Sequence, residues 1–135
     1  MAHALYGYDG PCKNVHGHSY QLNVTLIGEP IDDSSDVKFG MVMDFTDLKK
    51  IVNDEIIDQF DHALVVNKNS PHKELANHEQ WAGKIILADY QPSCENLLLD
   101  FVERIKRNLP ANVSLHNARL RETQTSYAEW FESDQ

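Results

Sequence analysis

The sequence predicts an α+β domain in which two helices pack on one face of a mainly antiparallel sheet. Three observations support this prediction: apolar residues recur at every second position in some segments, they recur at helical spacing in two others, and the two kinds of segment are interleaved. The predicted order is strand, strand, helix, short strand, helix, strand. With 135 residues, the chain is expected to form a single domain, residues 1–135, that buries its own core.

The first predicted strand covers residues 20–26, where apolar and polar residues alternate. Its apolar face is formed by Tyr20, Leu22, Val24 and Leu26. Turn-forming residues, among them Gly28 and Pro30, interrupt this pattern, and an extended apolar run resumes over residues 39–43. We therefore expect a hairpin that pairs the two segments.

The first predicted helix covers residues 46–59. Asp44 and Thr46 are both candidate N-caps, because short polar side chains can bond the free N–H groups of a first turn. The helix carries an apolar stripe formed by Leu48, Ile51, Val52, Ile56 and Phe60. A stripe of this width is typical of a helix that packs against a sheet.

The segment between the two helices is less regular. Residues 67–83 are polar, with a short helical segment expected around residues 74–81. Residues 84–90 are predicted to form a short strand.

Pro92 and Ser93 are predicted to open the second helix, and Pro110 stops it. Its apolar stripe is formed by Leu97, Leu98, Phe101, Val102, Ile105 and Leu109. Polar and apolar residues alternate again over residues 113–122, which predicts the final strand.

Composition restricts the partners of the chain. A formal net charge of −9, without a cluster of Lys and Arg, argues against nucleic-acid binding, because phosphate backbones are bound by clustered cations. No apolar run approaches the roughly 18 residues of a membrane span, and no leader peptide is expected. Two cysteines, Cys12 and Cys94, fit a reducing compartment, so we expect a cytoplasmic protein. An anionic small molecule stays possible where cations such as Lys13 gather.

One cluster of residues indicates chemistry. His16 and His18 flank Gly17, and side chains two positions apart on a strand point to the same side, so they can share one metal ion. His3 and Cys12 are further candidate ligands. Three histidines would leave the fourth tetrahedral position of a zinc ion open, as in catalytic sites. Cys12 with His16 and His18 is also a physically reasonable ligand set. The local sequence leaves both sets open.

Short motifs with polar and titratable residues are spread over nearly the whole chain. They are Ala2-His3-Ala4, Cys12-Lys13-Asn14-Val15-His16-Gly17-His18, Met43-Asp44-Phe45, Asp61-His62, Pro92-Ser93-Cys94-Glu95-Asn96 and Arg121-Glu122-Thr123. Their types and their order together resemble the family of 6-pyruvoyl tetrahydropterin synthases and 6-carboxytetrahydropterin synthases.

The resemblance implies the tunnelling fold, in which subunits of two helices and four strands join their sheets into barrels, commonly as two stacked trimers. It thereby implies a homo-oligomer, a trimer or a hexamer, with active sites between subunits. Members of this family usually have a full strand before the first metal-binding histidine. Here only Met1 and Ala2 precede His3, so we expect the N-terminal strand to be truncated.

The resemblance also implies the roles of individual residues. It implies that the zinc ligands are His3, His16 and His18. Cys12 is then free to act as a base, and a neighbouring cation or metal ion favours its thiolate. Asp61 and His62 would form a second proton-handling pair, in which the carboxylate orients the imidazole.

Three further residues are implied to bind the substrate. Glu122 would anchor the amino and ring N–H groups of the pterin, since a carboxylate accepts two parallel donors. Ser93 and Cys94 would line the pterin pocket, largely through backbone groups and the N-terminus of the following helix.

Within the family, the three residues between Cys12 and His16 resemble the bacterial carboxy-forming enzymes of the queuosine (7-deazaguanine) pathway. The implied substrate is 7,8-dihydroneopterin triphosphate, and the implied products are 6-carboxytetrahydropterin, acetaldehyde and triphosphate. Zinc would act as a Lewis acid on the side-chain hydroxyls of this substrate. The alternatives are a pyruvoyl-forming synthase, which releases triphosphate alone, and a zinc-dependent binding protein without turnover.

Overall fold

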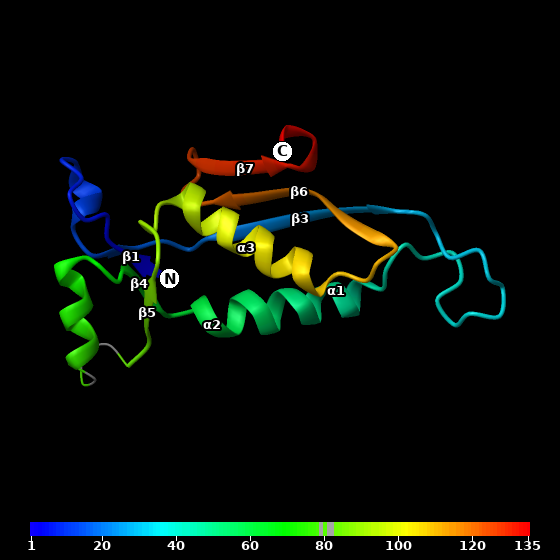
Figure 1. Ribbon diagram of the computed structural model, residues 1–135, viewed down its shortest axis with the longest axis horizontal. Coiled ribbons are helices and arrows are strands. Elements are labelled where there is room, and N and C mark those ends of the chain that lie inside the picture. The colour runs from blue at the N-terminus through cyan, green and yellow to red at the C-terminus, as the bar shows by residue number, and fades with distance from the viewer. Residues whose placement is uncertain (79, 81–82) are drawn as a thin grey trace.

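Two sheets lie end to end along the long axis of the molecule (Figure 1). The computed structural model describes residues 1–78, 80 and 83–135. The sheets approach each other where His3 of the smaller sheet lies 3.5 Å from Glu122, which follows the central strand of the larger one. Most of the residues singled out from the sequence gather at this junction.

The larger sheet is antiparallel, with the strand order β3-β6-β7. Its strands are β3 (Gln21–Gly28), β6 (Val113–Arg121) and β7 (Tyr127–Phe131). The register places Leu22 opposite Leu120 and Leu120 opposite Ala128, so the apolar residues of all three strands share one face. The strands predicted over residues 20–26 and 113–122 are confirmed as β3 and β6.

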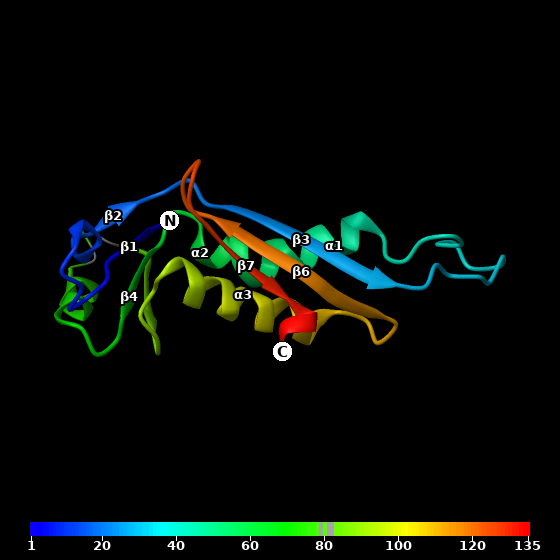
Figure 2. The ribbon, with the colours of Figure 1, turned by 90° about the horizontal axis from the view of Figure 1, so that it is seen from above.

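Helices cover the apolar face of this sheet (Figure 1), and Figure 2 shows them running along the strands. The first rod consists of α1 (Phe45–Val52), the π-helical turn η2 (Asn53–Ile57) and α2 (Asp58–Phe60), and the second is α3 (Cys94–Asn108). Asp44 caps the first rod by accepting the N–H of Thr46, and Ser93 caps α3 by accepting the N–H of Asn96. Both predicted helices, packed on one face, are confirmed.

The core lies between the helices and the larger sheet. Its buried members include Ile56, Phe60, Leu97, Phe101, Val102, Ile105, Leu115, Leu120 and Trp130. Each side chain of this size contributes roughly 1.5–3 kcal/mol when it is fully buried. The core therefore holds both helices against the strand ends that carry the site.

The smaller sheet has the order β2-β1-β4-β5. Its strands are β1 (Ala2–His3), β2 (His16–Gly17), β4 (Leu64–Asn67) and β5 (Ile85–Ala88). β1 is antiparallel to β2 and parallel to β4, and β4 is parallel to β5. The strand predicted over residues 84–90 is confirmed as β5. The described residues also form three 3₁₀ turns: η1 (Pro11–Lys13), η3 (Pro71–Asn77) and η4 (Glu132–Asp134).

The predicted hairpin is wrong. Residues 39–43 form no strand, and β3 pairs with β6 instead. Residues between 31 and 41 form a loop that closes on itself, because the N–H of Ile31 donates to Met41 and the N–H of Gly40 donates to Ile31. Gly40 has a φ of +82°, which an L-residue with a side chain rarely adopts.

Two strands and one helical segment also differ from the prediction. β4 and β7 were not predicted: β4 follows closely on the end of the first helix, and β7 follows closely on the last predicted strand. The helical segment expected around residues 74–81 is a 3₁₀ turn that begins earlier, at Pro71, and ends at Asn77. Residues 79, 81 and 82 of that expectation lie outside the described residues.

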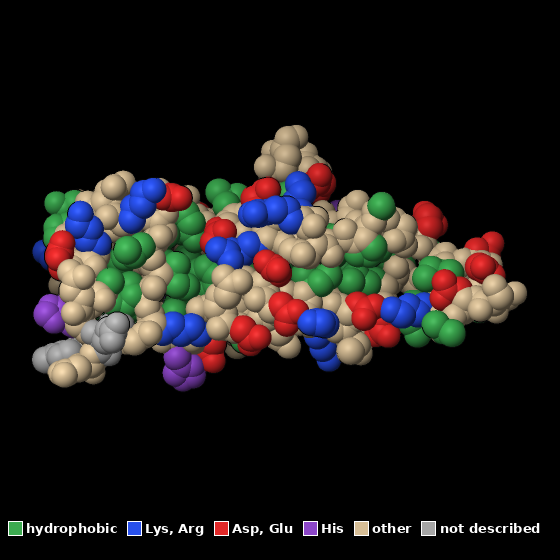
Figure 3. All heavy atoms as spheres, turned by 60° about the horizontal axis from the view of Figure 1, so that its bottom comes forward, with side chains coloured by type: hydrophobic (Ala, Val, Ile, Leu, Met, Phe, Trp, Pro, Cys, Tyr) green, Lys and Arg blue, Asp and Glu red, His purple; other side chains and the backbone are tan. Residues whose placement is uncertain are grey.

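Charged side chains of both signs alternate over the helical face of the molecule (Figure 3). They include ion pairs one helical turn apart, such as Lys50 with Asp54 and Arg104 with Asp100. This mixture is typical of a solvated helix face. Within the described part of the chain, no helix combines the length and apolar character that a membrane span requires.

Candidate metal centre and active site

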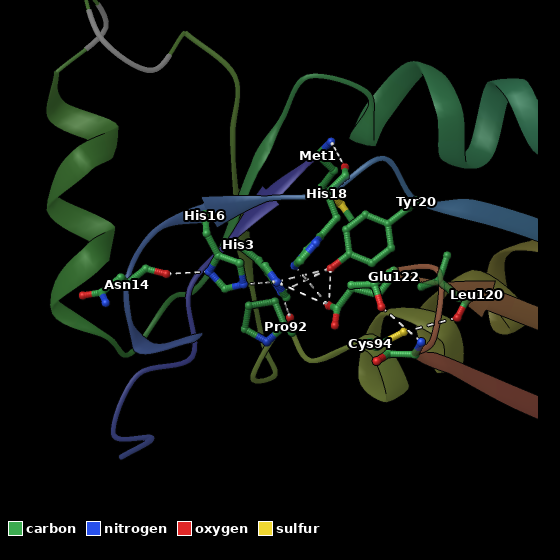
Figure 4. A network of polar contacts seen from close by, with 12 residues as sticks. Met1, His3, Asn14, His16, His18, Tyr20, Pro92, Cys94, Leu120 and Glu122 are labelled. Carbon is green, nitrogen blue, oxygen red and sulfur yellow. Dashed lines mark hydrogen bonds and ion pairs between the residues drawn. The ribbon is translucent and has the colours of Figure 1, made fainter. Parts of the chain in front are cut away.

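Three histidines converge at the junction of the two sheets (Figure 4). His3 on β1 lies opposite His16 on β2 in the strand register, and His18 follows two residues later. One ring nitrogen from each residue lies within 4.8 Å of the other two, so the group could hold a metal ion. The pairing of β1 with β2 thus brings together residues that are 13 positions apart.

In His3 and His16, the ring nitrogen Nδ1 points away from the group and is held by a backbone carbonyl. Nδ1 of His3 lies 2.6 Å from the carbonyl oxygen of Pro92, and Nδ1 of His16 lies 2.7 Å from that of Asn14. Because a carbonyl oxygen only accepts, each Nδ1 carries the proton and each Nε2 presents a lone pair. Hydrogen bonds of this kind orient metal-ligating imidazoles in proteins.

The Nε2 atoms of the three histidines have the arrangement that a cation requires. Nε2 of His3 and Nε2 of His16 lie 3.1 Å apart, so two lone pairs face each other. Two ligands of a tetrahedral zinc ion at 2.0–2.1 Å would be separated by roughly 3.3 Å. Nε2 of His18 is buried and has no hydrogen-bond partner among the described residues, although buried polar atoms are normally satisfied. The three nitrogens therefore fit one metal ion placed between them.

The surroundings of His3 keep its ring neutral. Burial is the largest effect and lowers the pKa of His3 below its ordinary value, and His16 and His18 lower it further. The hydrogen bond to Pro92 and the charge of Glu122 act in the opposite direction without cancelling the effect. A neutral imidazole is the form that binds a metal ion.

Glu122 and Tyr20 adjoin the histidines on the side of the larger sheet (Figure 4). Oε1 of Glu122 lies 3.5 Å from Nε2 of His3 and 3.8 Å from Nε2 of His18, and it accepts a 2.8 Å hydrogen bond from the Tyr20 hydroxyl. Burial and this hydrogen bond raise the pKa of Tyr20 far above its ordinary value, so its hydroxyl remains a donor. Glu122 is thus fixed beside the metal centre and is not a free side chain at a strand end.

Cys12 lies in the 3₁₀ turn η1, between β1 and β2. Its thiol is free and partly buried, and it does not belong to the three-nitrogen group among the described residues. The N–H of Leu5, two residues after His3, donates a 2.9 Å bond to the carbonyl oxygen of Cys12. Of the two ligand sets that the sequence left open, the geometry favours three histidines.

Asp61 and His62 form a hydrogen-bonded pair where α2 ends. Oδ2 of Asp61 accepts a 3.0 Å bond from Nδ1 of His62, and this bond lowers the pKa of the Asp61 carboxyl. Both side chains are exposed, by 59% and 90% respectively. They lie at the rim of a hollow of about 360 Å³ that is also lined by His18 and Tyr20. The pair therefore opens towards the same space as the metal centre.

Ser93 and Cys94 lie at the start of α3, next to the Pro92 carbonyl that holds His3. The Ser93 hydroxyl caps the helix, and the Cys94 thiol donates a 3.3 Å hydrogen bond to the carbonyl of Leu120. Burial raises the pKa of the Cys94 thiol to about 11. Both side chains are thus used in local structure, which leaves backbone groups as the contribution of this segment to a pocket.

Several functional groups of the site were not singled out from the sequence. Tyr20 was interpreted only as part of an apolar strand face, although it continues the every-second-residue spacing of His16 and His18, which could have indicated it. The carbonyls of Pro92 and Asn14 carry no side-chain signal at all. They become visible only once the fold is known.

A group of three histidines that could hold a metal ion, beside a carboxylate at the junction of two sheets, defines a small α+β protein with a candidate metal site. The chain belongs to the 6-pyruvoyl tetrahydropterin synthase family, because the model of that family matches residues 1–133. The resemblance found in the motifs is confirmed.

Individual relatives agree with this membership. The chain is 35% identical to a 6-carboxy-5,6,7,8-tetrahydropterin synthase from Haemophilus influenzae over 134 residues, which cover 98% of this chain and 92% of that protein. It is 30% identical to the protein of the same name from Rickettsia typhi, over 94% of this chain and 90% of the relative. The 6-pyruvoyl tetrahydropterin synthase of Caenorhabditis elegans superposes with a TM-score of 0.65 at 24% identity, covering 96% and 86% of the two chains. That similarity confirms the tunnelling fold.

Proposed function

We propose that this protein is a 6-carboxytetrahydropterin synthase, a lyase that converts 7,8-dihydroneopterin triphosphate and water into 6-carboxytetrahydropterin, acetaldehyde and triphosphate. The observation that supports this proposal most is that the three-nitrogen group excludes the thiol of Cys12. A site of this kind has a metal centre and a separate group for proton transfer. The names of the relatives from Haemophilus influenzae and Rickettsia typhi support the same activity. A place in queuosine biosynthesis is part of this proposal.

Zinc is the metal that the donor set fits best. Three neutral imidazoles suit zinc, and three protein ligands leave one tetrahedral position for substrate. The facing lone pairs of His3 and His16 and the unpartnered Nε2 of His18 support binding of a cation there. When bound, zinc supplies Lewis-acid chemistry that acidifies the side-chain hydroxyls of the substrate and the adjacent C–H bond.

Cys12 is the proposed base for the first proton transfer. Only the thiolate of a cysteine accepts a proton, and the Cys12 thiol is free and partly buried. The position of Cys12 outside the nitrogen group supports this role, because a sulfur bonded to zinc would not be available as a base.

Asp61 and His62 are the proposed second proton-handling pair. The carboxylate of Asp61 accepts the Nδ1 proton of His62, which leaves Nε2 of His62 to exchange a proton with substrate. The shared hollow with His18 and Tyr20 supports this role, because it gives the pair access to a ligand of the metal centre. Successive proton transfers would saturate the pterin ring and expel triphosphate, and water attack with carbon–carbon cleavage would release acetaldehyde.

Glu122 is the proposed anchor of the pterin. Its carboxylate is an acceptor for the amino and ring N–H groups, and the bond from Tyr20 fixes its orientation. Ser93 and Cys94 would contribute backbone groups to the pterin pocket, since their side chains have partners in the protein.

The proposed enzyme is a cytoplasmic homo-oligomer, a trimer or a hexamer, with active sites between subunits. Within the described chain, β3 and β7 each pair only with β6, so both outer edges of the larger sheet can accept a strand from another subunit. An apolar groove next to β3, lined in part by Met41, Met43 and Phe45, supports an interface at this edge. The two free thiols fit a reducing compartment.

Product analysis tests the proposed function. The protein is purified without added metal, its zinc content is determined, and products formed from 7,8-dihydroneopterin triphosphate are identified by mass spectrometry. We expect 6-carboxytetrahydropterin and acetaldehyde in equal amounts. A pyruvoyl product would replace the proposal with the triphosphate-lyase alternative, and an intact zinc site without turnover would indicate a binding protein.

A further inference from the structure

The Asp61–His62 pair lies in a turn with an unusual backbone conformation. His62 has a φ of +59°, and it is the only residue other than glycine with a positive φ in the described part of the chain. A side chain with a Cβ atom disfavours this left-handed conformation. Asp61 just before it is extended, with a φ of −63° and a ψ of 130°. The turn that aims both side chains therefore needs support from its surroundings.

Lys84 supplies contacts to this turn from a distant part of the chain. Its Nζ donates hydrogen bonds of 2.8 Å to the carbonyl oxygens of Asp58 and Asp61, which lie 26 and 23 residues earlier. The last carbonyls of a helix have no partners inside the helix, and a cation is favourable at this negative end of the helix dipole. One ammonium group thus closes the end of α2 and holds the residue that bears the carboxylate.

The backbone of Lys84 is itself held in place by hydrogen bonds. Its carbonyl oxygen accepts a 2.9 Å bond from the N–H of Leu64, and the next residue, Ile85, pairs with Leu64 in the parallel ladder of β4 and β5. The two strands therefore hold the backbone of Lys84 at a set distance from the turn. Lys84 and His62 also line a second hollow that reaches His18 of the metal centre.

We propose that Lys84 is a positioning residue for the Asp61–His62 pair, which holds the turn at the end of α2 so that both side chains face the metal centre. This inference rests on the proposed function of the pair. Lys84 does not exchange a proton in this scheme, and its ammonium group serves as a fixed double donor. Loss of that donor would free the turn to relax and would misplace the imidazole, while the three metal-binding histidines would keep their own supports.

The test compares Lys84→Met with Lys84→Arg and with a control, Lys68→Met. Lys68 follows β4 and forms an ion pair with Asp89, which follows β5, and it has no polar contact with the turn among the described residues. We expect Lys84→Met to lower kcat about tenfold with KM within a factor of two, since small misplacements of a catalytic group are costly. Lys84→Arg keeps the donors and should restore at least half of kcat. Lys68→Met should have the kcat of the unmodified protein, and all variants should keep their zinc.

A spectroscopic readout separates positioning from a general loss of stability. The backbone NMR shifts of His62 report its left-handed φ, and they should move in Lys84→Met but remain unchanged in Lys84→Arg and Lys68→Met. If the Met variant does not fold, Lys84→Leu, which also lacks a donor, takes its place. Unchanged His62 shifts in the folded variant that lacks a donor at position 84 would overturn the proposal, and so would an unchanged kcat in that variant where His62→Ala loses turnover.

One further variant distinguishes this proposal from the proposed function. Loss of turnover in His62→Ala would support the role of the pair. Full turnover in His62→Ala would remove the pair from the reaction and with it the catalytic consequence of Lys84. The NMR comparison still decides by itself whether Lys84 holds the turn.

Discussion

The hydroxyl of Tyr20 donates a 2.8 Å hydrogen bond to the carboxylate of Glu122, a residue 102 positions later in the chain. The same carboxylate oxygen lies 3.5 Å from Nε2 of His3. This bond connects the segment that carries the histidines with the end of the central strand β6. The proposed pterin anchor and the metal centre are thereby held as one unit.

Tyr20→Phe tests this connection. The substitution removes one partly buried hydrogen bond and should lower the free energy of unfolding by about 1 kcal/mol. It also frees Glu122 to rotate, so we expect KM to rise several-fold while zinc content stays the same. Urea denaturation and steady-state kinetics measure the two effects. Tyr8→Phe is the control, because Tyr8 is 48% exposed. Equal KM values for Tyr20→Phe and the unmodified protein would show that the bond does not position Glu122.

Cys12 and His16 should have separable roles. Cys12→Ala should retain zinc and lose turnover, because the thiol lies outside the nitrogen group but serves as the proposed base. His16→Ala should lose both zinc and turnover, because it removes one of three ligands. Metal analysis and product formation, measured on the same preparations, give the answer. A fully active Cys12→Ala protein would end the proposed role of the thiol.

Cys94 should be a slowly reacting thiol with a steep pH dependence. Burial raises its pKa to about 11, so about one molecule in a thousand carries the Cys94 thiolate at pH 8. Because the thiolate is the form that reacts, its alkylation by iodoacetamide should accelerate about tenfold per pH unit up to the region of this pKa. Mass spectrometry of the alkylated peptide follows the rate, with urea-unfolded protein as the reference. A folded protein that reacts at pH 8 as fast as the unfolded chain would contradict the buried environment of Cys94.

Removal of the metal should weaken the fold measurably. A ligand that binds only the folded state stabilises it by about 2.7 kcal/mol at a free concentration one hundred times its dissociation constant. Chelation should therefore lower the urea midpoint, and added zinc should restore it. His16→Ala should show no response to zinc, whereas His116→Ala, which alters an exposed histidine outside the group, should respond fully. A zinc response that survives in His16→Ala would place the metal elsewhere.

The elements that were predicted correctly have strong local patterns. The stripe of α3 and the alternation of β3 and β6 reflect burial on one side, which the sequence displays directly. The hairpin failed because the choice of a strand partner depends on distant residues. The apolar run at residues 39–43 resembled a strand, but Leu22 and Val24 find their partners in β6, nearly one hundred residues away.

Part of the site could be predicted because it also has a local sequence pattern. The spacing of His16 and His18 indicated that they could share one metal ion, and the register of β1 with β2 brings His3 next to them. The supporting groups had no comparable signal. The Pro92 carbonyl that orients His3 lies 89 residues away, and the ammonium group of Lys84, just before β5, lies 23 residues from Asp61 in the chain.

X-ray absorption at the zinc edge tests the central claim, that three imidazoles bind the metal while the sulfur stays free. The protein loaded with one equivalent of zinc should show only nitrogen and oxygen ligands at about 2.0–2.1 Å, with the multiple-scattering pattern of three imidazoles. This spectrum should be unchanged in Cys12→Ala and altered in His18→Ala. A sulfur ligand at about 2.3 Å, lost in Cys12→Ala, would contradict the account, because the thiol would then be bonded to the metal and could not act as the base.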